Sequence, residues 1–221
     1  MMTSIVAVVP VRTGSTRVLN KGTRGFGNTT LLENKIESLK KVNGLTDIIV
    51  SSDGQHILDI AHAAGVNTHL REEYYASSKC TGSEFFQNLA RSISCDVLVY
   101  SPPTSPFVKP ETVDKAIDLY KNQKCDSVAT VHPVKHHMWL DGNPLNYDIL
   151  NSPNSQNLPE IFRITYGVCI NSSKNVVKCK NVIGLNPYLL EISEIESVDI
   201  DTMLDFEFAQ HLFEKERNNN V

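Results

Sequence analysis

A short loop rich in cations and small hydroxyl residues follows the first apolar stretch of the chain. Residues 4–11 (SIVAVVPV) are apolar almost throughout, and the residues after them combine glycine, hydroxyls and cations: Arg12, Thr13, Gly14, Ser15, Thr16, Arg17 and Lys21. Glycine and small hydroxyls let backbone N–H groups approach a phosphate, while arginine and lysine supply positive charge. The spacing is neither that of a P-loop nor the GxGxxG of a dinucleotide site. We therefore interpret it as a triphosphate-binding loop, with a plain turn as the alternative.

Two aspartates near the C-terminus have the spacing of a metal-binding pair. The chain reads Val-Asp-Ile-Asp-Thr from position 198, and Asp205 follows. If this stretch is extended, Asp199 and Asp201 point to the same side, because side chains alternate along a strand. Two like-facing carboxylates suit a hard divalent cation. The alternative is that Asp201 or Thr202 caps the last helix, with Asp205 favoured by the helix dipole, but capping accounts for one aspartate and not for the pair.

Polar residues also follow two other predicted strands. After the second strand, Asp53 is placed to bind a ligand hydroxyl or a metal, or to cap the next helix, and the two roles can coexist. A later loop at positions 102–106 sets Thr104 and Ser105 among three prolines, which makes it stiff. Rigidity suits recognition of a base or a sugar, whereas the alternative is a structural turn.

The elements that must position these residues alternate between β-rich runs and amphipathic helical stretches. The predicted strands are residues 4–11, 47–51, 66–70, 96–101, 126–131, 163–170 and 182–185. The predicted helices are residues 31–42, 55–64, 83–93, 110–121 and 202–216. This rhythm is typical of an open, mostly parallel sheet with helices on both faces. In such sheets ligands bind beyond the carboxyl ends of the strands, which is where the polar loops lie.

The rhythm breaks after residue 131. The stretch from 132 to 157 is rich in Pro, Asn, His and Asp, and it holds the only tryptophan, Trp139. An insertion of this length without structure is unusual inside a compact domain unless it has a function. A surface loop, a lid and a subunit contact are the open interpretations. We predict one domain over residues 1–221, with residues 132–165 as a dimerisation or lid insertion.

Composition and charge exclude several classes of protein. The 221 residues carry a net charge of −4 with no basic run, so we expect no nucleic-acid partner. No stretch approaches the roughly 18 apolar residues that a membrane span requires, and no secretory signal is visible. The five cysteines are an odd number without a CxxC pair. We therefore expect a cytoplasmic protein with reduced thiols.

Six strings of residues, in chain order, resemble the CMP-sugar synthetase family, which includes the acylneuraminate cytidylyltransferases. They are VPVRTGSTRVLNK, VSSD, LREEYYASS, PPTSPF, LPEIFR and VDIDTMLDF. The resemblance runs from about residue 4 to residue 212 and is nearer to the acylneuraminate branch than to the Kdo branch. It implies an α/β fold: a mostly parallel, Rossmann-like three-layer sandwich of the nucleotide-diphospho-sugar transferase type, with a small dimerisation lobe.

The resemblance also implies roles for individual residues. The implied nucleotide-binding residues are Arg12, Gly14, Ser15, Arg17, Lys21, Arg71 and Ser78. The implied acceptor-binding residues are Thr104, Ser105, Arg163 and Tyr166. Asp199 and Asp201 would hold Mg²⁺, and Arg12, Lys21 and Asp201 would carry the catalysis. The insertion would form a dimer lobe that reaches into the partner's site.

The implied reaction is attack of an acceptor hydroxyl on the α-phosphorus of CTP, with pyrophosphate leaving. Several positions depart from the family's usual pattern: Thr16, Gly22, Pro102, Val108, Ser78 and Tyr166 replace Lys, Asn, Gln, Arg, Asp and Asn. The resemblance implies that these positions contact nucleotide or sugar. The cations implied to bind phosphate and the aspartate pair are, in contrast, present in this sequence.

The resulting hypothesis is cytidylyl transfer to an acidic sugar such as an N-acylneuraminate, pseudaminate or legionaminate, for surface glycans. The alternatives are another acid or a phosphonate as acceptor, a changed nucleotide preference, a non-catalytic nucleotide- or sugar-binding protein, and a Rossmann oxidoreductase, which lacks its glycine fingerprint.

Overall fold

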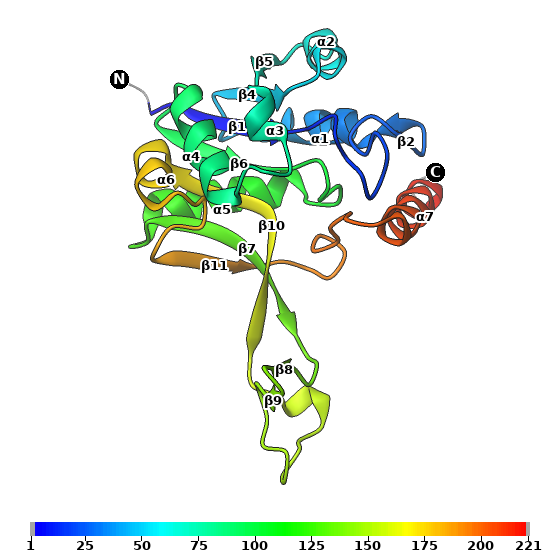
Figure 1. The fold of residues 1–221 in the computed structure, drawn as a ribbon, viewed down its shortest axis with the longest axis vertical. Helices are drawn as coiled ribbons and strands as arrows, with labels where there is room; N and C mark the ends of the chain where they lie inside the picture. The colour runs from blue at the N-terminus through cyan, green and yellow to red at the C-terminus, as the bar shows by residue number, and fades with distance from the viewer. Residues whose placement is uncertain (1–2, 220–221) are drawn as a thin grey trace.

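A seven-stranded sheet forms the centre of the molecule (Figure 1). The computed structural model describes residues 3–219, with side chains through residue 216. The strand order is β11-β7-β10-β6-β1-β4-β5, and only β10 is antiparallel to its neighbours. The strands are β1 (Ile5–Pro10), β4 (Asp47–Ser52), β5 (Asn67–Leu70), β6 (Val97–Tyr100), β7 (Ser127–Val134), β10 (Ile161–Ser172) and β11 (Pro187–Glu191). The predicted mostly parallel sheet is confirmed.

Helices cover both faces of this sheet. Helices α1 (Leu31–Leu39), α2 (Gln55–Ala63) and α5 (Pro110–Asn122) share one apolar cluster with the strands. Helices α4 (Gly82–Ser92) and α6 (Ser173–Cys179) share a second cluster. The predicted three-layer α/β sandwich is therefore the fold, since β1, β4, β6, β7 and β10 contribute alternate side chains to the two clusters.

Local signals explain where these helices begin. Thr30 accepts from the Glu33 N–H at the start of α1, and Thr81 and Glu84 form a reciprocal capping box at the start of α4. Pro110 occupies the first turn of α5, where its missing N–H has no helical partner to lose. The short helix α3 (Glu73–Ala76) lies between β5 and α4.

A third, smaller core joins the C-terminal helix to the N-terminal half of the chain. Helix α7 (Met203–Asn219) packs against the hairpin of β2 (Gly25–Phe26) and β3 (Thr29–Thr30). The ring of Phe26 lies 5.9 Å from that of Phe206 and 4.7 Å from that of Phe213. Phe107 and Ile200 are buried in the same cluster. This core fixes the segment that carries the two C-terminal aspartates.

The predicted insertion forms a lobe that projects from the sheet as a continuation of β7 and β10 (Figure 1). It contains β8 (Trp139–Leu140), β9 (Asn143–Pro144) and a 3₁₀ turn at Ser155–Asn157. Asn146 is buried, accepts from the Met138 N–H and donates to the His136 carbonyl. The lobe is therefore hydrogen-bonded internally and is not the structureless stretch that its composition indicates.

The prediction of a strand at residues 182–185 is wrong, because these residues form no strand. The strand that pairs with β7 is β11, which begins at Pro187. The preceding residues turn at Gly184, which has φ +76°, because the Asp126 carboxylate accepts from the N–H groups of Leu185 and Asn186. Val182 is buried in the second cluster without pairing in the sheet. Its apolar character reflects that packing.

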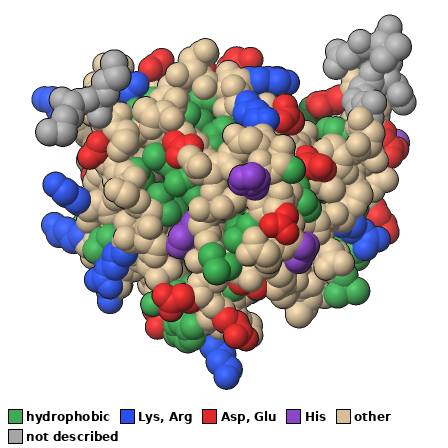
Figure 2. Space-filling view, turned by 90° about the horizontal axis from the view of Figure 1, so that it is seen from above, with side chains coloured by type: hydrophobic (Ala, Val, Ile, Leu, Met, Phe, Trp, Pro, Cys, Tyr) green, Lys and Arg blue, Asp and Glu red, His purple; other side chains and the backbone are tan. Residues whose placement is uncertain are grey.

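Two further observations concern the helices and the surface of the described residues. Among residues 3–219, no helix is long and apolar enough to cross a membrane. On the face away from the lobe, the lysine and arginine side chains of the described residues lie in small groups among acidic ones (Figure 2).

The turn at Gly184 yields a stability prediction. A Cβ at this position would lie 2.6 Å from an Asp126 carboxylate oxygen, whereas Gly65 has a similar φ of +73° and open space around it. Both Gly184→Ala and Gly65→Ala must adopt a left-handed backbone, at about 1–2 kcal/mol. We expect Gly184→Ala to lose about 1–3 kcal/mol more unfolding free energy, because of the clash. Urea unfolding measures both variants, and equal losses would contradict the argument.

Candidate active site at the carboxyl ends of the strands

A pocket of about 310 Å³ opens at the carboxyl ends of β1 and β6. It lies between the loop after β1, the segment from α3 to the start of α4, and the loop after β6. Five residues predicted from the sequence to bind nucleotide or acceptor line it: Arg12, Ser15, Lys21, Arg71 and Thr104. The position beyond the strand ends is the one expected for a ligand in this class of sheet.

Asp53 holds the loop after β1 in place. Its carboxylate accepts from the Thr13 N–H at 3.0 Å and from the Thr13 hydroxyl at 2.5 Å. Burial alone would raise the pKa of Asp53, but the hydrogen bonds from Thr13 outweigh it and hold the pKa below its ordinary value. The predicted capping role is wrong, because Gly54 is the N-cap of α2 and receives no side-chain cap. The carboxylate is turned toward Thr13.

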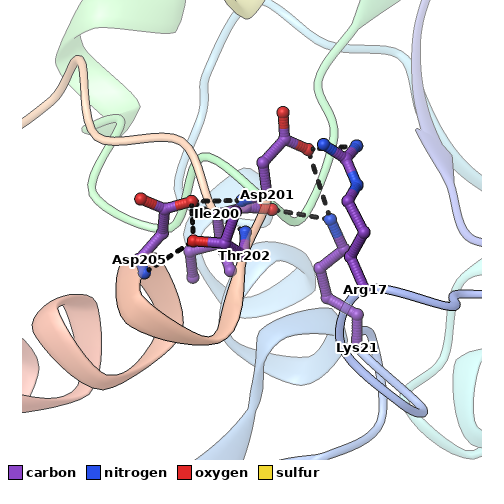
Figure 3. Close-up of polar contacts among 6 residues, drawn as sticks. All are labelled: Arg17, Lys21, Ile200, Asp201, Thr202 and Asp205. Atoms are coloured by element: carbon purple, nitrogen blue, oxygen red, sulfur yellow. Dashed lines mark hydrogen bonds and ion pairs between the residues drawn. The ribbon is translucent and has the colours of Figure 1, made fainter.

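The cations of the first loop meet the C-terminal acidic segment (Figure 3). Arg17 forms an ion pair with Asp201 at 3.0 Å, and the Lys21 ammonium lies 3.6 Å from the same carboxylate oxygen. Lys21 also donates to the Ile200 carbonyl at 2.6 Å. Burial lowers the pKa of Lys21, an effect that Asp201 and Asp199 oppose. Arg17 and Asp201 are more than half exposed, so their pair contributes little stability and is free to exchange partners.

Asp199 lies in a different environment from Asp201. It is half-buried and lines a second hollow, of about 450 Å³, together with Arg163 and Phe208. Burial raises the pKa of Asp199, although a hydrogen bond with Thr104 acts in the opposite direction. Residues 198–200 form no strand, so the predicted alternation does not set the direction of the two carboxylates. They are nevertheless close enough for Asp201 to raise the pKa of Asp199 further.

The capping role proposed for this segment belongs to Thr202. Its hydroxyl accepts from the Asp205 N–H at 3.3 Å, and the Asp205 carboxylate accepts from the Thr202 N–H at 2.7 Å and the Asp201 N–H at 3.1 Å (Figure 3). Thr202 and Asp205 thus satisfy the start of α7 between them. Asp199 and Asp201 have no part as side chains in this cap.

Arg71 joins the ends of two strands while facing the pocket. Its side chain is 5% exposed, and it donates to the Val11 carbonyl at 3.1 Å and to the Ser51 hydroxyl at 3.2 Å. A further, short hydrogen bond reaches the Ser51 carbonyl. The guanidinium also lies 5.0 Å from the centre of the Phe85 ring. Arg71 is therefore part of the frame of the pocket as well as of its lining.

Several predicted residues lie outside this pocket. Gly14 and Ser78 are exposed, and Ser77 lines the pocket in place of Ser78. Ser105 is buried, and its hydroxyl has no hydrogen-bond partner among the described residues. Tyr166 has φ +54° and stacks on Phe86, with ring centres 6.4 Å apart.

Arg163 forms hydrogen bonds with another residue of the chain, Ser197. It donates to the Ser197 carbonyl and hydroxyl, both at 3.1 Å. It therefore faces the second hollow from a fixed position, beside the half-buried Asp199.

Sequence reasoning missed an aromatic wall of the pocket. Tyr75, Phe85 and Tyr100 line it, together with Cys80. Burial raises the pKa of Tyr100, which keeps its phenol neutral. Tyr100 ends β6, so the rule that ligands bind at strand ends could have found it. The other aromatic residues come from α3 and α4, whose approach to this edge depends on tertiary packing.

The fold and the sequence comparisons agree on the class of protein. The sheet is that of the nucleotide-diphospho-sugar transferases. Solved structures of CMP:2-keto-3-deoxy-manno-octonic acid synthetase complexed with CTP (TM-score 0.67, 12% identity, 97% of this chain and 100% of that chain) and of 4-diphosphocytidyl-2C-methyl-D-erythritol synthase from Anaerococcus prevotii (TM-score 0.71, 15% identity, 96% of each chain) share it. Residues 6–155 match the family described as Cytidylyltransferase. The chain belongs to that family and is a nucleotidyltransferase.

Curated relatives resemble it over different lengths. A CMP-N,N'-diacetyllegionaminic acid synthase from Legionella pneumophila is 28% identical, over 95% of this chain and 96% of that protein. An N-acylneuraminate cytidylyltransferase from Escherichia coli is 26% identical over 100% of this chain, which spans 55% of that protein's length. A 3-deoxy-manno-octulosonate cytidylyltransferase from Bdellovibrio bacteriovorus is 30% identical over 59% of this chain and 51% of that protein.

The two arginines of the pocket differ in how much they stabilise the protein. Arg71→Met removes the donor to the Val11 carbonyl and one of two donors to the Ser51 carbonyl, which keeps the Val11 N–H, and we expect a loss of about 1–3 kcal/mol of unfolding free energy. Arg12 is exposed and makes one long hydrogen bond, of 3.4 Å, to the Ala76 carbonyl. We expect Arg12→Met to change the free energy by less than about 0.5 kcal/mol. Denaturant unfolding compares them, and an equal effect would contradict the structural role of Arg71.

Proposed function

We propose that the protein transfers a cytidylyl group from CTP to an acidic sugar of the nonulosonic class, such as an N-acylneuraminate, pseudaminate or legionaminate, for the synthesis of surface glycans. The observation that carries the proposal is the meeting of Lys21 and Arg17 with Asp201 beside an aromatic pocket at the strand ends. Support for the acceptor class comes from the relatives that act on legionaminate and acylneuraminate.

The pocket suits a nucleoside triphosphate. Among the lining residues, Arg12, Ser15 and Lys21 offer cations and a hydroxyl to which phosphates would bind. Phe85 and Tyr75 offer rings on which a pyrimidine base would stack. Preference for CTP is supported by family membership and by the solved neighbour that is complexed with CTP.

The reaction needs positioning and charge neutralisation more than a nucleophilic side chain. The acceptor hydroxyl attacks the α-phosphorus, the bond to the β-phosphate oxygen breaks, and pyrophosphate leaves. Arg12 and Lys21 would neutralise the charge that develops on the leaving pyrophosphate. Lys21 is suited to this role because its carbonyl and carboxylate partners hold its ammonium at a fixed place beside the pocket.

The aspartate pair fits Mg²⁺. Among residues 3–216 there is no cluster of three or more His, Cys, Asp or Glu side chains placed to hold a metal ion. Mg²⁺ does not require one, because it is commonly bound by one or two carboxylates together with waters and substrate phosphates. Asp199 and Asp201 would supply those carboxylates, and the half-burial of Asp199 favours a bound cation. When bound, the ion supplies charge stabilisation at the phosphates.

The acceptor is proposed to lie near the second hollow. Arg163 offers a guanidinium there for a carboxylate, and Thr104 joins the hollow to the nucleotide pocket through Asp199. Of the departures from the family pattern, Pro102 lines the nucleotide pocket, Val108 is buried and Tyr166 stacks on Phe86. They favour an acceptor that differs from N-acetylneuraminate itself, with another sugar acid, or an acid or phosphonate, as the alternative.

The direct test is pyrophosphate release from CTP and Mg²⁺ against a panel of nonulosonic acids, Kdo and phosphonates. We expect one acceptor class to support release, and Asp201→Asn to reduce the rate about 100-fold or more by removing a charged ligand. Asp59→Asn is the matched control, since Asp59 is exposed on α2 and, within the described part of the chain, accepts a hydrogen bond from the Gln55 side chain alone. If no acceptor in the panel supports pyrophosphate release but the protein still binds CTP, the proposed acceptors are rejected. If there is neither pyrophosphate release nor CTP binding, a different ligand for this fold is favoured.

We further propose that the lobe pairs two copies of the chain. Its exposed apolar side chains are Met138, Trp139, Leu140, Leu145, Ile149 and Leu150. They are carried on an arm that is rigid through the β7–β10 pairing and the buried Asn146. A concentration of exposed apolar groups on one arm is typical of an interaction surface. A second copy of the chain supplies the same arm, as the predicted homodimer requires.

Light scattering tests this assembly. We expect a dimer, and we expect Leu150→Glu to weaken it, because Leu150 is 94% exposed on the lobe and would be desolvated in the interface. Leu185→Glu is the control, since Leu185 is 80% exposed but lies at the turn before β11. A monomeric wild-type protein, or equal weakening by both variants, would reject the lobe as the interface.

A further inference from the structure

Side chains on one face of α1 hold the loop that follows β6. Lys35 donates to the Ser105 carbonyl at 2.7 Å, Asn34 to the Pro106 carbonyl at 3.1 Å, and Ser38 to the Val108 carbonyl at 3.4 Å. The loop contains three prolines, at positions 102, 103 and 106, which have no N–H to donate. It cannot build a backbone ladder of its own, so the helix supplies the donors.

Lys35 is the unusual member of this set. Its side chain is 1% exposed, and among the described residues no ion pair joins it to a carboxylate. Burial lowers its pKa to about 7. Burying an ammonium group without an opposite charge is costly, and methionine would fill a similar volume without that cost. Filling space in the core therefore does not explain a lysine at this position. The need for a hydrogen-bond donor to the Ser105 carbonyl does explain it.

The Ser105 carbonyl is adjacent in the chain to Thr104, a residue connected to both the nucleotide pocket and the second hollow. Thr104 lines the nucleotide pocket, and its hydrogen bond with Asp199 reaches the second hollow. The Thr104 carbonyl accepts from the Ile200 N–H at 2.9 Å. A shift of the peptide after Thr104 would therefore be passed to Ile200 and to the aspartates on either side of it.

Helix α1 is also tied to the cationic loop. The Leu32 N–H, in its first turn, donates to the Gly22 carbonyl at 2.9 Å, directly after Lys21. The same helix thus bonds the loop that carries the cations and the loop that carries Thr104. Such a shared support fixes the distance between the two sides of a site.

We propose that Lys35 is a positioning residue for the transfer reaction: its side-chain amino group fixes the Ser105 carbonyl by a hydrogen bond and thereby places Thr104 and the Asp199–Asp201 segment against the bound nucleotide. The proposal rests on the proposed cytidylyl transfer. Lys35 itself touches neither the pocket nor the second hollow, so it acts through Thr104.

The test uses Lys35→Met, which keeps the volume and removes the donor, and Lys35→Gln, which keeps a neutral donor. We expect kcat to fall about 10- to 100-fold in Lys35→Met, as small misplacements of reacting groups do. The Kd of CTP, measured without acceptor, should change less than about threefold. We expect Lys35→Gln to recover part of the rate. Lys40→Met is the matched control, because Lys40 directly follows α1, is exposed, and forms an ion pair with Glu37 and with no other residue that the structure describes.

A second measurement does not require activity. Hydrogen exchange at the Ile200 amide reports the bond to Thr104, and we expect its protection to fall in Lys35→Met while the melting temperature does not fall. A lower melting temperature with unchanged kcat and unchanged Ile200 protection would overturn the proposal and leave a purely structural lysine. If the wild-type protein transfers to no acceptor, the proposed function fails, and Ile200 exchange alone then decides whether Lys35 positions the segment.

Discussion

The backbone of Ile200 holds the two sides of the site together. Its N–H donates to Thr104 in the loop after β6, and its carbonyl accepts from Lys21 in the loop after β1. Its side chain is fully buried in the small core with Phe26 and Phe107. Burying an apolar side chain of this size contributes roughly 1.5–3 kcal/mol, so the segment is held in place without belonging to a helix or strand. The two aspartates flank this fixed point.

The site combines a rigid frame with a few exposed charges. Arg71 and Asp53 are bound to backbone or loop groups that fix the ends of β1 and β4. Arg17 and Asp201, in contrast, form a mostly exposed pair whose partners can be replaced at little cost. Such an arrangement suits a reaction in which phosphates and a cation enter together, because the frame keeps its geometry while the exposed charges change partners.

Predictions from the sequence succeeded where a regular apolar pattern governs the backbone. The apolar run at residues 4–11 contains β1, and the periodic stretch that begins with Pro110 is α5, where the pattern agrees with a proline in the first turn. These predictions failed where the local sequence is compatible with two different structures. Asp53 could cap the next helix, but it binds Thr13, 40 residues away in the chain. Val182 could begin a strand, but it is buried without pairing, and the chain turns at Gly184 before β11 begins.

The sequence by itself determined the α/β alternation, the family and the loops that carry cations, hydroxyls and carboxylates, because these depend on the order of residue types along the chain. Only the tertiary structure decided that Asp201 faces Arg17 while Asp199 lies half-buried beside Thr104. It alone also built the aromatic wall and brought Lys35 to the Ser105 carbonyl. Each of these contacts joins residues distant in sequence, so it follows from how helices and strands pack and not from any local pattern.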